Sequence, residues 1–132
     1  MKPTRSKAMA RKFARGVASS GALASASPVA ALRISLRLPR RKFARLLGRT
    51  ERAIIDWETG KANLQGLSQQ RVRELERLTG ALQELFDPTI LGEWFDTPNP
   101  GLGNLKPIEV IERGESDRLW QMIFEIRSGS HV

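Results

Sequence analysis

Residues 38–61, LPRRKFARLLGRTERAIIDWETGK, decide the fold of this 132-residue chain. The stretch holds two short helical patterns, the first opening at Pro39 and ended by Gly48. Thr50 stands where the second helix needs an N-cap, and Gly60 closes that helix as its C′ residue. The turn between them is about three or four residues long, and two helices joined by so short a glycine-containing turn form a helix-turn-helix.

Helical patterns continue on both sides of this motif. The preceding helix is indicated by Ala31, Leu32, Ile34, Leu36 and Leu38. A longer helix is predicted over residues 68–86, where apolar residues recur at spacings of three and four, namely Val72, Leu75, Leu78, Leu82 and Leu85. Two more follow, one opened by Pro107 and ended by Gly114, and one over residues 116–127. Because no stretch alternates apolar and polar residues for long enough to predict a strand, we expect an all-α fold.

Charge divides the chain unevenly. Residues 1–50 contain thirteen Lys or Arg and no acid, whereas residues 51–132 hold nine basic residues and all fourteen acids; the net charges are +13 and −5, and their sum is +8. This split predicts that the basic half meets a polyanion and that the acidic half does something else.

Three regions follow from composition: a basic flexible arm at 1–28, the helix-turn-helix at 29–62, and a further helical domain at 63–132. The arm has few large apolar residues and no secretory h-region, but an extension upstream of the native start and a targeting peptide stay open as alternatives.

Composition also excludes several kinds of catalytic chemistry. The chain has no Cys and no Tyr, and its one His is His131, so we expect no thiolate nucleophile, no Ser-His-Asp triad and no His-rich zinc site. Only scattered carboxylates such as Glu109, Glu112 and Glu115 would support a hydrolase or transferase. No apolar run approaches the roughly 20 residues that span a bilayer. We therefore expect a cytoplasmic protein that is not an enzyme and that needs no metal and no cofactor.

The quoted stretch resembles the helix-turn-helix of Xre-type and phage-repressor-like DNA-binding proteins. Small Ala44 at the helix crossing, Gly48 at the turn and the inward Ile54 and Trp57 carry the resemblance. The chain has Pro39-Arg40 where the family usually has Thr/Ser-Gln, so the familiar Gln contact to DNA is absent and its role would fall to Arg40.

With Ile54 and Trp57 inward, a spacing of 100° per residue puts the opposite face of that helix toward a major groove. Arg52 is the best base reader, because an Arg can hold a guanine edge in a bidentate fork. Asp56 would either pair with Arg52 or accept from a cytosine amino group, and Glu58 is expected to pair with Arg33 or Arg37. The predicted DNA-binding residues are Arg40, Arg41, Lys42, Arg49, Thr50, Arg52, Ile55, Asp56, Thr59 and Lys61. The alternative is a packed scaffold with a solvated basic face.

The last helix is apolar around much of its circumference. Its six large apolar residues spread over about 200° of the helical wheel, twice the stripe of roughly 100° that a surface helix buries. Either this helix is central in its domain or part of it meets another chain. The predicted dimer or partner interface consists of Trp94, Trp120, Met122 and Phe124.

The region around this helix carries a second resemblance, in the stretch LFDPTILGEWFDTPNPGLGNLKPIEVIERGESDRLWQMIFEIRSG. It is similar to the toxin-binding domain of Xre/MbcA/ParS-type antitoxins through, in order, Trp94, Pro98-Asn99-Pro100, Leu102-Gly103, Pro107 with Glu109, Gly114 and Gly129. A second Gly is common in the family after Gly103. Asn104 stands there, and it tolerates a left-handed conformation.

This resemblance implies a type II antitoxin that silences a cognate RES-domain toxin, an enzyme that consumes NAD or uses it to modify a protein. It further implies a homodimer that binds its own operator DNA and whose chain end occludes the toxin's active site. The predicted toxin-binding residues are Arg127, Ser128, Gly129, Ser130, His131 and Val132. A frayed terminus is the alternative for these six, and a dimeric DNA-binding regulator without a toxin partner is the alternative for the whole chain.

Overall fold

The computed structural model describes residues 27–129, so nearly all of the predicted arm, together with Ser130, His131 and Val132, lies outside the described residues. The α-helices are α2 (Pro28–Ser35), α3 (Arg40–Leu47), α4 (Glu51–Thr59), α5 (Gly66–Leu85), α6 (Leu91–Phe95), α7 (Pro107–Glu112) and α8 (Ser116–Ser128). Two 3-10 turns, η1 (Pro88–Ile90) and η2 (Pro100–Leu102), flank α6. The predicted all-α fold is confirmed, because residues 27–129 contain no strand, only one isolated bridge between Asn99 and Leu105.

The first helix is shorter than its apolar pattern indicated. Ser27 caps it, accepting the Ala30 backbone N–H at 2.9 Å, and it ends at Ser35 because Arg37 adopts a left-handed φ of 56°. Leu36 and Leu38, which the sequence placed in this helix, follow it as turn and loop residues and are nevertheless buried. Their burial therefore comes from tertiary packing and not from a helical face.

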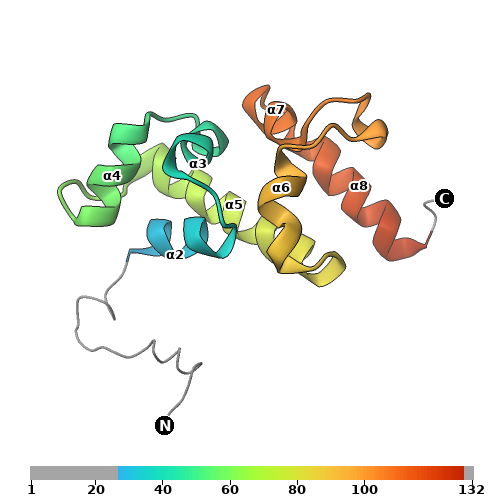
Figure 1. The fold of residues 1–132 in the computed structure, drawn as a ribbon, viewed down its shortest axis with the longest axis horizontal. Coiled ribbons are helices and arrows are strands. Elements are labelled where there is room, and N and C mark those ends of the chain that lie inside the picture. Colours follow the sequence, from blue (N-terminus) through green and yellow to red (C-terminus); the bar gives the residue numbers. More distant parts are fainter. Residues whose placement is uncertain (1–26, 130–132) are drawn as a thin grey trace, which may run out of the picture.

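Helix α5 is shared by the two halves of the fold. Figure 1 shows α2, α3 and α4 on one side of the molecule, α6, α7 and α8 on the other, and α5 running between them. Its buried residues Val72, Leu75, Leu78 and Leu82 belong to one hydrophobic cluster that extends from α2 to α8. Although the sequence divides the chain at residue 62, the buried side chains of the two parts form one continuous core.

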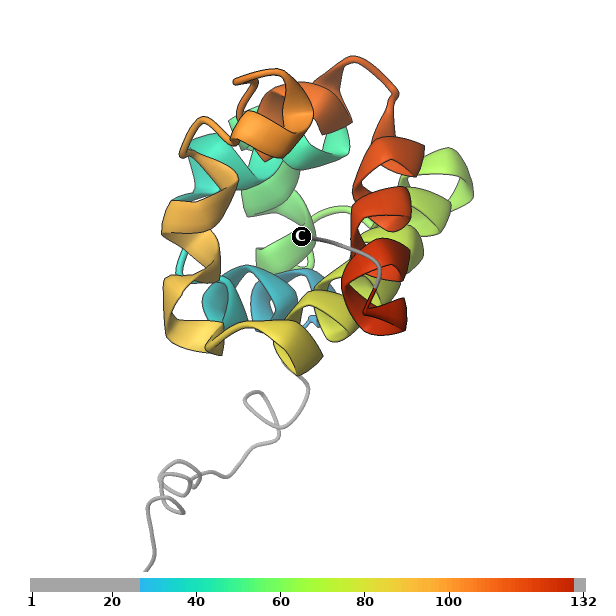
Figure 2. The same ribbon diagram turned by 90° about the vertical axis from the view of Figure 1, so that its right-hand side faces the viewer.

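Glycine makes the junction between α2 and α6 possible. A Cβ at Gly92 would collide with the carbonyl oxygen of Leu36, which is backbone and cannot move aside cheaply. Helix α6 therefore packs directly against the chain that leaves α2. Seen toward the α6–α8 end, α7 lies between α6 on one side and α8 on the other (Figure 2).

The turn between α6 and α7 keeps the conformation expected of it. Asn99 caps η2 by accepting the Gly101 N–H at 2.8 Å, and Asn104 adopts a left-handed φ of 68°, directly after Gly103 at 67°. The prediction that Asn104 takes this conformation is confirmed. In α7, the Glu109 side chain accepts the Lys106 N–H at 2.8 Å, which satisfies a donor at the start of the helix.

Candidate functional site

The α3–α4 turn has the geometry that its sequence predicts. Gly48 ends α3 in the left-handed conformation at φ 65°, and Thr50 caps α4 by accepting the Ala53 N–H at 3.1 Å. Ala44 and Ile54 are buried between the two helices, and Trp57 completes their inner face. This packing fixes the outward face of α4.

That outward face is polar. The Arg52 side chain is 71% exposed, and its guanidinium lies 3.8 Å from Asp56 Oδ1. Asp56 Oδ1 is buried and has no hydrogen-bond partner within residues 27–129, so the ion pair with Arg52 is the nearest interaction that offsets its burial. Ile55 is half-buried, and the exposed Thr59 uses its hydroxyl to donate to the Ile55 carbonyl at 2.9 Å. Of these residues, Arg52 presents the freest polar group.

Glu58 anchors the other side of α4. Its carboxylate is 5% exposed and accepts from Arg33 Nε at 2.6 Å and from Arg40 Nε at 2.9 Å. Burial raises the pKa of Glu58, but the hydrogen bonds from the two arginines outweigh it and hold the pKa below the ordinary value. The expected pairing with Arg33 is present. The second partner is Arg40 rather than Arg37, so the arginine expected at a phosphate has part of its charge committed inside the protein.

Two further ion-pair groups join α3 to the acidic half. Lys42 and Lys106 both pair with Asp96, at 2.5 Å and 3.3 Å. Arg45 holds Glu112 with two hydrogen bonds of 2.7 Å and 2.8 Å. Hydrogen bonds from Lys42 and Lys106 lower the pKa of Asp96, and those from Arg45 lower the pKa of Glu112. Lys42, predicted to contact phosphate, is thus also partly neutralised.

Arg41, Arg49 and Lys61 remain the more available cations of the predicted DNA-binding set, because all three are exposed and form no ion pair within residues 27–129. Arg49 lies over the Trp57 ring at 5.1 Å and donates to Ser68 Oγ at 2.6 Å. These contacts hold its guanidinium between Trp57 of α4 and the first turn of α5.

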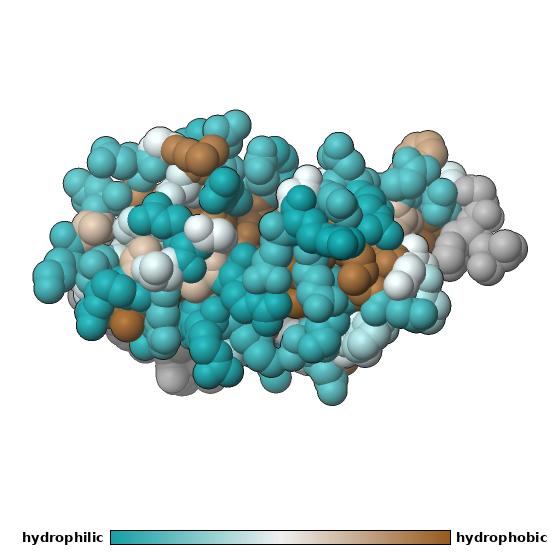
Figure 3. All heavy atoms as spheres, turned by 90° about the horizontal axis from the view of Figure 1, so that it is seen from above, coloured by the Kyte–Doolittle hydropathy of each residue, from teal (hydrophilic) through white to brown (hydrophobic). Residues whose placement is uncertain are grey.

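Helix α8 separates the predicted partner interface into two groups. Leu119 and Ile123 are buried and form the inner stripe. Trp120 and Phe124, four residues apart on one flank, are 37% and 64% exposed. In the space-filling view of Figure 3, hydrophobic groups stand among a mostly hydrophilic surface over both halves of the molecule. The two aromatic rings on α8 are large apolar groups that the described core leaves in contact with water.

The second group consists of Trp94, in α6, and Met122, on the other flank of α8. The Trp94 ring packs on Phe86 at 5.6 Å and edge-on to Phe95 at 5.3 Å. Met122 is half-buried, and its Sδ accepts from the Asn99 side-chain amide at 3.9 Å. Both residues line a groove between α6, η2 and α8. Trp94 and Met122 therefore shape the fold here in addition to lining its surface.

The end of α8 is tied to α5. Arg127 pairs with Glu84 at 2.9 Å, and Gly129 ends the helix in the left-handed conformation at φ 74°. The chain consequently changes direction at Gly129, as expected of a C′ glycine. Ser128 is exposed, and the remaining predicted toxin contacts at 130–132 lie outside the described residues.

Comparison with known proteins places this arrangement in a family. The chain is 30% identical over 81 residues to the mycobacterial cidal antitoxin MbcA of Mycobacterium tuberculosis (strain ATCC 25618 / H37Rv), an alignment that covers 61% of this chain and 72% of the relative. MbcA of Mycobacterium bovis (strain ATCC BAA-935 / AF2122/97) matches with the same figures. The chain belongs to the MbcA antitoxin family.

A solved structure agrees with this assignment. A chain in the crystal structure of the M. tuberculosis MbcT-MbcA toxin-antitoxin complex superposes with a TM-score of 0.66 and 26% sequence identity, covering 80% of this MbcA-type antitoxin and 95% of the other chain. No protein-family model matches the sequence. In the described part of the chain, no helix is long and apolar enough to cross a membrane, and no group of three or more His, Cys, Asp or Glu side chains could hold a metal ion.

The sequence analysis of this MbcA-type antitoxin missed two arginines of α5 that share a cleft with Arg49. Arg71 donates to the Leu47 carbonyl at 3.1 Å, and Arg71 and Arg77 line the same cleft as Arg49. Both lie in the half of the chain with net negative charge, where Glu74 and Glu76 separate them. A charge count by segment hides such residues, and only a helical wheel of residues 66–85 could have picked them out.

Proposed function

We propose that this chain neutralises a cognate RES-domain toxin by binding it, without any catalytic step of its own. Family membership supports an antitoxin role, and the solved neighbour is a toxin-antitoxin complex. The observation that carries the proposal is the exposed pair Trp120 and Phe124, because a described core that leaves two large aromatic groups in water favours a protein partner. The RES identity of that partner rests on the resemblance in residues 85–129.

In this proposal the chain end blocks the toxin's active site. Arg127 fixes the last turn of α8 to α5, and Gly129 lets the chain leave the helix there. The segment beyond it, Ser130, His131 and Val132, is small and polar enough to enter a nucleotide-binding cleft. Occlusion of this kind needs no catalytic group in the antitoxin.

The α2–α4 half would bind the operator that controls the chain's own expression. Arg52 would read a base edge from the exposed face of α4, and Arg41, Arg49 and Lys61 would contact phosphates. Dimerisation through the C-terminal half would double these contacts and match a two-fold symmetric site. Toxin bound to the same dimer could then change how well it represses.

The test is co-expression with the adjacent open reading frame, followed by size exclusion of the tagged antitoxin. We expect that the neighbouring product alone arrests growth, and that the full chain restores growth and elutes with it. A neighbour that is harmless and elutes separately would favour the dimeric regulator instead. If the purified antitoxin alone depleted NAD beyond its own molar amount, a non-catalytic role would be wrong.

A truncation separates occlusion from simple complex formation. Deleting residues 128–132 keeps the Arg127–Glu84 pair and removes the last residue of α8, its capping Gly129 and the segment proposed to enter the toxin. We expect an unchanged fold, unchanged DNA binding and weaker neutralisation. Full rescue of growth by the truncated chain would show that the tail does not occlude the active site.

A further inference from the structure

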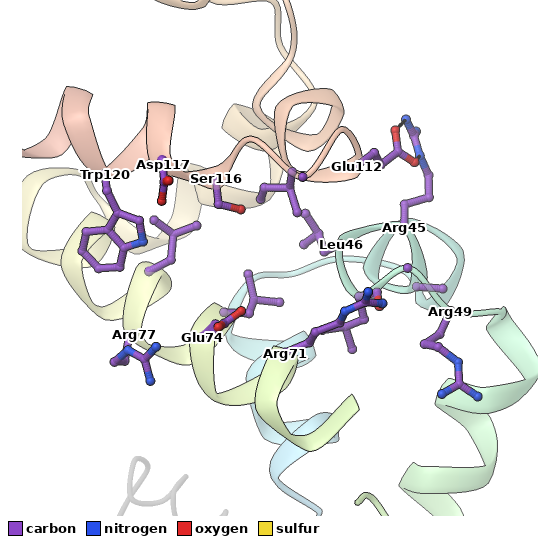
Figure 4. A pocket seen from close by; sticks show the side chains of 17 residues that line it. Arg45, Leu46, Arg49, Arg71, Glu74, Arg77, Glu112, Ser116, Asp117 and Trp120 are labelled. Carbon is purple, nitrogen blue, oxygen red and sulfur yellow. Dashed lines mark hydrogen bonds and ion pairs between the residues drawn. The ribbon is translucent and has the colours of Figure 1, made fainter. Parts of the chain in front are cut away.

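Four arginines line one cleft of about 820 Å³, namely Arg45, which is paired with Glu112, and three others. Arg49 comes from the α3–α4 turn, and Arg71 and Arg77 come from α5. In Figure 4 they lie along one side of the cleft, with Trp120, Asp117 and Glu112 across from them. The cleft therefore has a basic wall that begins at the α3–α4 turn.

Short contacts hold this wall in place. Arg49 donates to Ser68 Oγ at 2.6 Å, and Arg71 donates to the Leu47 carbonyl at 3.1 Å. Both bonds join the first two turns of α5 to the residues that precede α4. The basic wall therefore begins where the α3–α4 turn meets the first turns of α5.

The charges of this wall are not neutralised by ion pairs. Within residues 27–129, Arg49, Arg71 and Arg77 form no ion pair with a carboxylate, whereas Arg45 across the cleft is held by Glu112. Glu74 lies three residues from both Arg71 and Arg77, and it too lines the cleft without pairing with either. Three guanidinium groups are thus available to an external anion.

We propose that Arg71 and Arg77 extend the DNA contact along α5, so that the sugar-phosphate backbone flanking α4 continues past Arg49 onto these two side chains. The inference rests on the proposed DNA binding by α4 and adds to it a second row of phosphate contacts. Arg71 and Arg77 are six residues apart, or about 9 Å of helix axis, and a guanidinium matches phosphate oxygens in a bidentate fork. Continuity with Arg49 favours this partner over an acidic protein segment.

The salt dependence of DNA binding tests the proposal. Each phosphate contact steepens the plot of log affinity against log salt by about 0.9 on duplex DNA. The double variant Arg71→Ala/Arg77→Ala should therefore flatten the slope by roughly 1.8 relative to the full chain on its upstream DNA. The matched control is Arg113→Ala/Arg118→Ala, which removes the same charge from residues that pair with Glu115, and its slope should stay unchanged.

Two further variants guard against a folding artefact. Arg77→Ala alone removes a side chain that makes no hydrogen bond or ion pair within residues 27–129, and it should flatten the slope by about 0.9. Arg71→Lys/Arg77→Lys keeps both charges and should keep the slope. Removing the intervening acid with Glu74→Gln should raise affinity at low salt by about threefold, because it relieves repulsion of phosphate without adding a contact.

The outcomes also separate this inference from the proposal on which it rests. If Arg49→Ala and Arg52→Ala weaken binding but Arg71→Ala/Arg77→Ala changes the slope no more than its control, α4 binds DNA and the α5 contact is wrong. If the full chain binds no DNA in low salt, both fail. If the α5 variants spare DNA binding but weaken the toxin complex, the basic wall contacts protein and the inference is overturned.

Discussion

Helices α4 and α8 bury the same small number of side chains, but the chemistry of their exposed surfaces differs. Each has two buried large residues, Ile54 and Trp57 in α4 and Leu119 and Ile123 in α8. Outside these stripes α4 presents mainly charged and hydroxyl groups, whereas α8 presents two aromatic rings among its polar groups. Because water solvates the first surface well and the second poorly, the two helices favour different partners: a polyanion for α4 and another protein for α8. Salt should weaken the first association far more than the second.

The largest expected effect is on the binding of a protein partner by α8. The double variant Trp120→Asp/Phe124→Asp places two charges on the apolar flank and should weaken binding of the protein partner more than about 100-fold, since buried aromatic anchors dominate interface energies. Size exclusion and titration of the complex measure it. The unfolding midpoint should fall only moderately, because Phe124 is 64% exposed, whereas Trp120, at 37%, packs part of its ring against the fold.

Arg118→Asp is the matched control, because it makes the charge of the helix more negative by the same two units at a position about 160° from Trp120 and 120° from Phe124 around the helix. Complex formation should survive it. A complex that tolerated the double variant as well as the control would show that the partner binds elsewhere.

The next effect concerns the support of α4. Glu58→Ala leaves Arg33 and Arg40 without their shared carboxylate. Removing one partner of a buried pair costs several kcal/mol, and partial exposure of Arg40 reduces this to about 2 to 3 kcal/mol of unfolding free energy. Chemical denaturation measures the change.

The exposed Glu115 offers a comparison, since it also bridges two arginines. Glu115→Ala should cost less than about 0.5 kcal/mol because surface ion pairs contribute little. Equal losses of unfolding free energy for the two variants would mean that the burial of Glu58 does not strengthen the contribution of its ion pairs to stability.

A smaller and more specific effect is expected at Arg52. Arg52→Ala should relax the preference for one base by about 1 to 3 kcal/mol while leaving much of the non-specific affinity. Selection of bound sites from a random pool reads this out directly. Arg52→Lys keeps the charge without the fork and should lose the same base preference. Loss of all DNA binding by Arg52→Ala would identify it as a scaffold residue.

The smallest effect is a pH dependence of stability. Glu58, Asp96 and Glu112 all have pKa values below their ordinary ones in the folded protein. Their pairing therefore stabilises the fold above the ordinary carboxyl pKa of about 4 and is lost as pH falls through the lower folded values. Through this contribution the thermal unfolding midpoint should change little between pH 7 and pH 5. It should decrease as the pH falls below about 4.5. Glu112→Gln should make the decrease of the midpoint at acid pH shallower. An unchanged decrease would show that Glu112 does not contribute to it.

Local signals made much of the fold predictable. Gly48, Thr50 and Gly60 act through neighbouring backbone groups, so their residue types alone placed the turn and the ends of α4. The same is true of Asn104 in its left-handed turn. Such features depend on contacts within a few residues, which a linear sequence displays.

The ion pairs were less accessible to sequence reasoning. Lys42 pairs with Asp96, 54 residues away along the chain, and Arg45 pairs with Glu112, 67 residues away. Nothing in the local sequence pattern links these partners. For that reason Arg40 and Lys42 stood among the phosphate contacts, whereas each has a carboxylate partner in the fold. The arginines of α5 were missed for the converse reason, because nearby acids masked them in the charge count.

The sequence by itself determined the all-α class, the helix-turn-helix, the excess of apolar residues on the last helix and the resemblance to antitoxins, since helix periodicity and capping are local. Tertiary structure decided which charges stay free, because that depends on which distant carboxylate each arginine meets. It also decided which flank of α8 remains open: packing against α5 and α7 covers Leu119 and Ile123 and leaves Trp120 and Phe124 partly in contact with water.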